Sequence, residues 1–99
     1  MSNLIKQLST LTSGSVSIGD TKQDIQLIHN AASLAVTLTI SLPANPVDAQ
    51  KVGIVSVLGV TTLTLSSALS IIGGITVLAA AAYATYMYEA STNQWYRVS

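Results

Sequence analysis

The feature that most constrains this sequence is a long stretch, Val52 to Tyr88, without a single charged side chain. A transmembrane helix needs about 20 consecutive apolar residues, so the stretch is long enough to cross a bilayer. However, serine and threonine recur throughout it, and glycines interrupt it at Gly53, Gly59 and Gly73–Gly74. In residues 62–66 every second residue is apolar, which is the period of a half-buried strand. We therefore predict β-structure here, with a membrane-spanning helix within Val52–Tyr88 as the alternative.

Short strand patterns recur along the rest of the chain. Residues 35–42 alternate most clearly, and their even-numbered positions, expected on one face, are all aliphatic. Pro43 and Pro46 end this strand, because proline fixes φ and lacks the backbone donor. The last two strands flank the polar residues 90–94 and are typical of a hairpin. In chain order the predicted strands are residues 15–18, 24–29, 35–42, 51–58, 62–66, 71–72 and 75–78 around the glycine pair, 83–89 and 95–98.

Seven or eight short strands at this spacing predict one small all-β domain, an antiparallel sandwich, barrel or prism, over residues 15–99. Residues 1–14 precede it as an N-terminal arm. The apolar residues of the arm have helical spacing, but its serines and threonines are poor helix formers. A short amphipathic helix and an extended docking arm both remain open. The candidate docking residues of the arm are Leu4, Ile5, Leu8 and Leu11.

The chain carries few charges for its apolar content, with 8% charged and 49% hydrophobic residues. An ordinary soluble domain has about 25% charged residues. Residues 51–58 have apolar side chains at both odd and even positions, so that strand is expected to be covered on two faces. A chain of 99 residues cannot cover many such strands alone, so we expect identical copies to shield one another. The net charge is zero, and nucleic acid is not an expected partner.

The sequence shows no catalytic, metal-binding or cofactor-binding pattern. The single histidine, His29, lies at a strand end before a turn, and we interpret it as structural. Cysteine is absent, and Asp20 and Asp24 lack the dense acidic spacing of a calcium loop. The Gly73–Gly74 pair lacks the Lys and Ser/Thr of a phosphate-binding loop. We therefore expect a protein that is not an enzyme and that uses no metal or cofactor.

The aromatic side chains gather in the predicted C-terminal hairpin. Alternation places Tyr83 on the same face as Met87, and Tyr86 on the same face as Tyr88. Such residues pack across strands within a hairpin, and they are also enriched at protein interfaces. Internal packing is therefore one interpretation, and a subunit contact or a sugar-binding platform is the other. The candidate residues are Tyr83, Tyr86, Tyr88, Trp95 and Tyr96.

The segment from Thr37 to Val52 resembles a module of phage tail-fibre, head-fibre and capsid decoration proteins. That module has an alternating strand, Leu-Pro, a short spacer, Asp-Gly-Gln and a second strand. This chain has Leu42-Pro43 and then Asp48-Ala49-Gln50 at the corresponding places. The likeness continues through residues 61–65, a Thr/Leu strand, and through the closing aromatic hairpin, residues 86–98.

The resemblance covers about residues 30–98 and departs from the module at one informative position. Ala49 stands where the module has glycine. If this turn requires a positive φ, alanine strains it. The resemblance implies an all-β virion component that is often trimeric, and it carries over no catalytic residues.

These observations lead to one expected function and two alternatives. We expect a non-enzymatic bacteriophage structural protein, a capsid decoration (cement) or head-fibre component on the capsid or tail surface of the virion. Its expected partners are its own copies, three by the resemblance, and the major capsid protein or other virion proteins. One alternative is a tail-fibre or receptor-binding adhesin module, which sugar binding by the aromatic hairpin would favour. The other is a small membrane protein that spans the bilayer within Val52–Tyr88.

Overall fold

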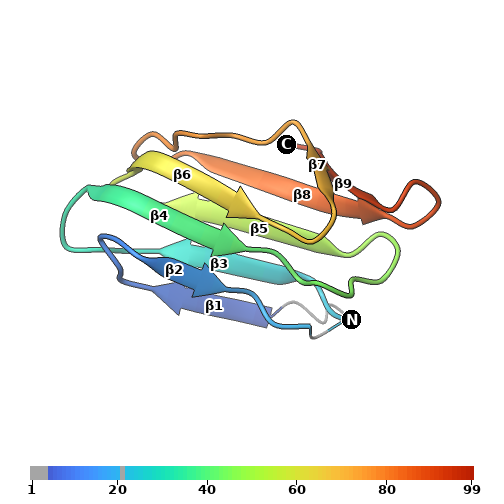
Figure 1. Ribbon diagram of the computed structural model, residues 1–99. Helices are drawn as coiled ribbons and strands as arrows, with labels where there is room; N and C mark the ends of the chain where they lie inside the picture. Colours follow the sequence, from blue (N-terminus) through green and yellow to red (C-terminus); the bar gives the residue numbers. More distant parts are fainter. Residues whose placement is uncertain (1–4, 21) are drawn as a thin grey trace.

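The computed structural model describes residues 5–20 and 22–99, and every regular element in this part of the chain is a β-strand (Figure 1). The predicted all-β class is thus confirmed. The strands form a six-stranded sheet in the order β1-β3-β5-β8-β9-β7 and a three-stranded sheet in the order β2-β4-β6. Their bounds are β1 (Ile5–Ser9), β2 (Ser15–Ser17), β3 (Ile25–His29), β4 (Ala35–Ser41), β5 (Lys51–Ser56), β6 (Val60–Ser66), β7 (Ser70–Ile72), β8 (Tyr83–Glu89) and β9 (Gln94–Arg97).

The first six strands alternate between the two sheets, so the chain winds through three coils. Within the larger sheet β1 pairs with β3 and β3 with β5, and within the smaller sheet β2 pairs with β4 and β4 with β6, all in parallel. Each parallel crossover contains a strand of the opposite sheet, where most proteins place a helix. This path is that of a short β-solenoid. The expected antiparallel sandwich, barrel or prism is therefore wrong for these six strands.

An antiparallel hairpin caps the third coil. β8 pairs antiparallel with β5 and with β9, which confirms the predicted aromatic hairpin. β7 lies parallel to β9 on its other side. Residues 75–78 are a connector along β6 rather than the predicted strand, with Leu78 bridged to Val60. Residues 52–88, for which a membrane-spanning helix was the alternative, hold β5 to β8 instead.

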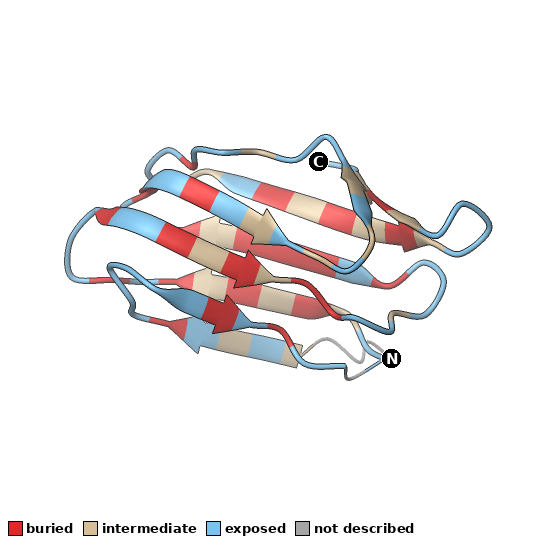
Figure 2. Cartoon of the chain, viewed as in Figure 1, coloured by how far each residue is buried: buried red, intermediate tan, exposed pale blue. Residues whose placement is uncertain are grey.

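Buried residues lie along strands of both sheets (Figure 2), and aliphatic side chains from the two sheets form the core between them. Leu27 and Ile54 from one sheet and Leu38 from the other are almost fully buried. One predicted inward residue is misplaced, because Val36 is 64% exposed. The ladder between β4 and β6 leaves out Val36 and Thr61 and keeps the same register on either side. The alternation of buried and exposed residues reverses at this irregularity.

The predicted arm contributes an edge strand to the larger sheet. Residues 5–9 are extended in β1 rather than helical, and the amide of Ile5 donates to the Asp24 carbonyl (2.8 Å). Of the candidate docking residues, Ile5 packs half-buried against the core, whereas Leu8 and Leu11 are exposed. Leu4 lies outside the described residues. Docking of this segment on a partner stays a prediction.

The Asp-Ala-Gln turn joins the third coil to the cap. The Ala49 amide donates to the Tyr88 carbonyl (2.8 Å), and the Tyr88 amide donates to the Gln50 carbonyl (2.9 Å). The buried Gln50 side chain accepts from the Val47 amide (3.1 Å) and donates to the Gln23 carbonyl (2.8 Å). Ala49 has a φ of 66°, in the left-handed region that favours glycine. Alanine at this position therefore holds the turn at a cost in stability.

Ala49→Gly should stabilise the protein by about 0.5–1 kcal/mol. It removes a backbone strain of about 1–2 kcal/mol, and the larger conformational entropy of glycine in the unfolded chain offsets part of this gain. The urea midpoint of unfolding measures the effect. Ala44→Gly is the matched control, since Ala44 is exposed in the preceding loop and does not have a positive φ. A midpoint that falls in Ala49→Gly as it does in the control would contradict strain at this turn.

Candidate functional site

One end of the winding holds most of the charged side chains. Its turns include residues 18–20 with 22–24, residues 42–50 and residues 90–93, which follow β2, β4 and β8 at the right of Figure 1. All four carboxylates of the chain accept a backbone N–H at this charged end, which fixes the turns. The pairs are Asp20 with Ala44 (2.9 Å), Asp24 with Lys51 (2.9 Å), Asp48 with Ala90 (3.0 Å) and Glu89 with Thr92 (3.1 Å). The acids are therefore distributed as turn caps rather than gathered at a reaction centre.

Asp20 makes the most extensive of these caps. Its Oδ1 also accepts from the Asn45 amide (3.2 Å), and its Oδ2 accepts from Asn45 Nδ2 (2.9 Å). These hydrogen bonds, led by the one from the Asn45 side chain, favour the charged carboxylate and hold the pKa of Asp20 below its ordinary 3.8. The ionised form of Asp20 thus links the β2–β3 turn to the proline-containing loop.

The opposite end of the winding carries no charged residue. It comprises residues 10–14, 30–34, 57–59 and 77–82, and we call it the apolar end. Its segments lie against one another: the Val36 amide donates to the Thr12 carbonyl (3.0 Å), and the Ala35 amide donates to the Gly59 carbonyl (3.3 Å). Of the eleven large hydrophobic side chains exposed in the described part of the chain, seven lie in or beside these segments: Leu11, Leu34, Val36, Val57, Leu58, Val77 and Tyr83.

This clustering distinguishes the apolar end from an ordinary surface. Single exposed hydrophobic residues are common, whereas contiguous apolar patches mark interaction sites. Val36 and Val77 are 64% and 60% exposed, and no charged side chain from the surrounding turns covers them. The low charge content predicted that part of the surface needs a cover, and most of the exposed large hydrophobic side chains of the described residues lie at this end.

His29 is buried beneath the apolar end and links two of its segments by hydrogen bonds. Its Nε2 lies 2.6 Å from the Leu11 carbonyl, and its Nδ1 lies 2.8 Å from Ser56 Oγ. A carbonyl can only accept, so Nε2 donates to Leu11, and in the neutral ring Nδ1 then accepts from the Ser56 hydroxyl. Ser56 Oγ in turn accepts from the Gly59 amide (2.9 Å). His29 thus lies at a strand end as predicted, buried and with both ring nitrogens engaged, and its structural role stays a prediction.

The outer face of the three-stranded sheet has a different character, because it carries aligned hydroxyl groups. Ladder pairing places Ser15, Thr39 and Thr64 in one row across the three strands. A second row has serine on all three strands, and Thr37 lies beside Thr62 in a third. Such a polar face is hydrated without a covering partner. The hydroxyl face can therefore remain exposed to water, whereas the apolar end is stabilised by burial against another surface.

Most of the candidate aromatic residues fill the inside of the cap. Tyr86, Tyr88 and Trp95 are buried, and the ring centroids of Tyr88 and Trp95 lie 5.6 Å apart. Burial raises the pKa of Tyr86, whose hydroxyl donates to the Gly73 carbonyl (3.3 Å). Internal packing, one of the two interpretations, thus holds for these three residues.

The two remaining aromatic residues lie on the outer face of the larger sheet. Tyr83 is 63% exposed and stands opposite Val55 at the start of β8. Tyr96 is half-buried and stands opposite Met87 near the end of β8. Tyr83 on β8 and Tyr96 on β9 thus lie beside opposite ends of β8 and do not form a continuous stacking platform.

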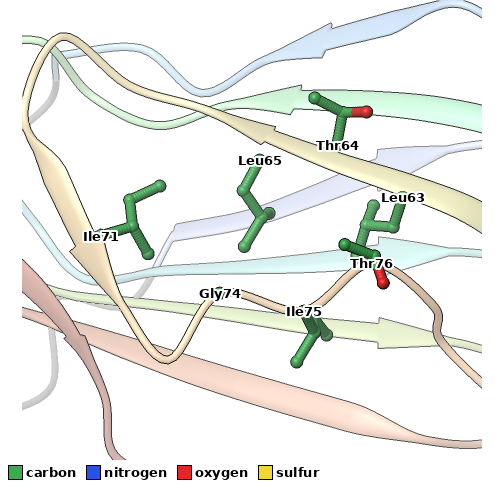
Figure 3. A pocket seen from close by; sticks show the side chains of 7 residues that line it. All are labelled: Leu63, Thr64, Leu65, Ile71, Gly74, Ile75 and Thr76. Atoms are coloured by element: carbon green, nitrogen blue, oxygen red, sulfur yellow. The ribbon is translucent and has the colours of Figure 1, made fainter.

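A shallow pocket of about 350 Å³ lies between β6, β7 and the connector that follows them. Leu65, Ile71 and Ile75 surround it, and two threonine hydroxyls are its polar side-chain groups (Figure 3). The pocket has no titratable lining residue. Its chemistry suits an apolar group and provides neither an acid nor a base.

Three further findings define the class of protein. Within residues 5–20 and 22–99, no three His, Asp or Glu side chains are grouped to hold a metal ion, and no helix is long and apolar enough to cross a membrane. Comparison of the chain with protein-family models, curated proteins and solved structures finds no significant match. The fold itself therefore defines the class, a small all-β protein with three parallel coils and an antiparallel cap.

Asp20→Asn should destabilise the protein at about pH 7 but have little effect at about pH 2. The lowered pKa of Asp20 means that its carboxylate stabilises the fold above the unfolded-state pKa, and this contribution is lost as the pH falls through the folded-state pKa. Urea unfolding of both proteins at the two pH values provides the measurement. Equal differences between wild type and variant at both values would show that the charge of Asp20 does not stabilise the turn.

Proposed function

We propose that this protein is a non-catalytic structural protein of a bacteriophage particle, a capsid decoration or head-fibre component that works as a homo-oligomer. The observation that carries the proposal is the apolar end, with seven exposed large hydrophobic side chains and no charge. The particle setting rests on the resemblance of residues 30–98 to virion modules. Three copies are the state that this resemblance implies.

The energetics favour self-association through the apolar end. Fully burying one exposed Val or Leu side chain contributes about 1.5–3 kcal/mol, so a few such residues are enough for a specific contact. Identical copies meet there without like-charge repulsion, because the surface is uncharged on both sides. A closed ring would cover every copy equally and prevent open-ended growth. The charged ends would then remain in water.

Attachment to the particle would use the first coil. Leu8 and Leu11 are exposed and remain the candidate docking residues for the major capsid protein or another virion protein, with Leu8 in β1 and Leu11 at the margin of the apolar end. The adhesin alternative is less well supported, because a sugar platform needs several accessible rings and three of the five aromatic side chains are buried. The chemistry of the described surface therefore favours a decoration or head-fibre role.

Val57→Asp should dissociate the contact between apolar ends and lower the mass of the assembly at about 10 µM, because it places a charge where copies meet. Native mass spectrometry measures the number of chains. Val47→Asp is the matched control, since Val47 is similarly exposed (39% against 46%) but lies in a turn of the charged end. A wild-type protein that is already a single chain, or a Val57→Asp variant with unchanged mass, would contradict assembly through the apolar end.

The particle role predicts that the purified protein co-sediments in fixed ratio with empty capsids of the source phage. Leu8→Asp, which lies in β1 outside the apolar end, should weaken this binding by at least tenfold, which corresponds to about 1.4 kcal/mol. Val47→Asp again serves as the control. Absence of binding by the wild-type protein would refute a capsid role while leaving the oligomer intact.

A further inference from the structure

The first coil presents two strand edges that no described element covers. β1 pairs only with β3, and β2 pairs only with β4. Both edges therefore lie at the same side of the molecule, at the bottom of Figure 1. The other side is closed, because β8 pairs with β5 and the Leu63 amide donates to the Thr76 carbonyl in the connector (2.8 Å). The winding is thus capped at the third coil and open at the first.

The hydrogen bonds of β1 identify which backbone groups are free. Ile5 donates to the carbonyl that precedes β3, and Ser9 accepts from the amide that follows β3, each at 2.8 Å. The odd-numbered residues of β1 thus turn their backbone groups toward β3. Because these directions alternate along a strand, Lys6 and Leu8 direct their N–H and C=O groups outward.

The same argument applies to β2. The Gly14 carbonyl accepts from β4 (2.8 Å), and the Ile18 amide donates to the last carbonyl of β4 (2.9 Å). Ser15 and Ser17 therefore direct their backbone groups outward. The Ser17 carbonyl accepts from Gln7 Nε2 (3.1 Å), which places the middle of β1 beside β2 across the first coil.

These edges carry little of the usual protection against strand addition. Natural edge strands are shielded by proline, bulges, charged side chains or their own shortness. Here β1 and β2 contain no proline and their ladders are continuous, and the protection is limited to Lys6 in β1 and to the three-residue length of β2. Such an edge accepts a further strand through main-chain hydrogen bonds.

We propose that a second copy of this chain covers both edges in a head-to-head pair related by a two-fold axis. The cap blocks the third coil, so head-to-tail stacking is excluded and the contact joins two first coils. Antiparallel pairing of β1 about Gln7 places Lys6 opposite Leu8 of the other copy. These are the residues whose backbone groups face outward, so the pairing satisfies them on both chains.

The β2 edge fits the same axis. Pairing about Val16 places Ser15 opposite Ser17 of the other copy, and the outward backbone groups meet there, with the Ser17 carbonyl, already an acceptor from Gln7, using its second lone pair. The Gln7–Ser17 hydrogen bond holds the two strand centres together, so that one axis serves both sheets. Val16 then adjoins its own copy on the core side, and Lys6 adjoins a leucine rather than a second lysine, so no like charges are opposed.

This inference shares with the proposed function the premise that the chain self-associates, but it uses a different surface. A two-fold contact doubles whatever assembly the apolar end produces. Three copies joined through their apolar ends would become six, and chains without that contact would form pairs. Even copy numbers are therefore the signature of the edge contact.

The test removes two outward backbone N–H groups and keeps the hydrogen bonds of β1 to β3 and of β2 to β4. The double variant Lys6→Pro with Ser15→Pro deletes two edge donors, whereas Lys6→Ala with Ser15→Ala changes the same side chains and retains the donors. Native mass spectrometry at about 10 µM should show half the wild-type mass for the proline pair and the wild-type mass for the alanine pair. Equal masses for the two folded variants, or an odd copy number in the wild type, would overturn the inference.

Amide hydrogen exchange on the wild-type protein decides the matter if the proline variant does not fold. The amides of Lys6, Leu8, Ser15 and Ser17 should become protected as the protein concentration rises, and unprotected amides at all concentrations would overturn the pair. The Val57→Asp variant separates the two surfaces. A Val57→Asp dimer that the proline pair splits supports the edge contact, whereas a Val57→Asp monomer from an odd-numbered wild type refutes it and leaves the proposed function standing.

Discussion

The in-register parallel pairing of successive coils is the interaction on which the rest of this structure depends. It aligns Leu27 with Ile54 in one sheet and Leu38 with Leu63 in the other, so that the inward aliphatic groups form one continuous core. A shift of one residue would turn each strand's apolar set outward. The same pairing sends alternate turns to opposite ends of the molecule, and this geometry creates a charged end and an apolar end.

The local features of the fold were predictable, but the pairing was not. The alternation of apolar and polar residues located most strands and the aromatic hairpin, because a strand buried on one face has an apolar residue at every second position. Parallel and antiparallel strands share that period, so alternation cannot distinguish them. The available signal was the similarity of residues 37–40 (Thr-Leu-Thr-Ile) to residues 62–65 (Thr-Leu-Thr-Leu). Thr37 pairs with Thr62, so the distance between the two segments in the sequence is the length of one coil. The exposure of Val36 depends on a register irregularity that no local pattern indicates.

The sequence predicted that the candidate site is an apolar surface, but it did not predict where on the fold this surface lies. Low charge predicted that part of the surface needs a cover, yet the position of that surface follows from which turns share an end. The charges of Asp20 and Asp48 are far apart in sequence but cap turns at the same end. Burial of Tyr86 and Trp95 likewise depends on the cap closing over the third coil. The Ala49 departure was the exception, because the positive φ it implied is found.

The distribution of polar groups explains why this fold suits assembly better than chemistry. The carboxylates hold turns, His29 has both nitrogens engaged, and the aligned hydroxyls face water on a flat sheet. The described chain has two features that a partner would cover, exposed apolar side chains at one end and outward backbone groups at the first coil. The first is met by burial against another surface, and the second by main-chain hydrogen bonds. Both needs are satisfied by another polypeptide, and the self-complementary register of β1 and β2 makes a copy of the same chain the partner that meets the second.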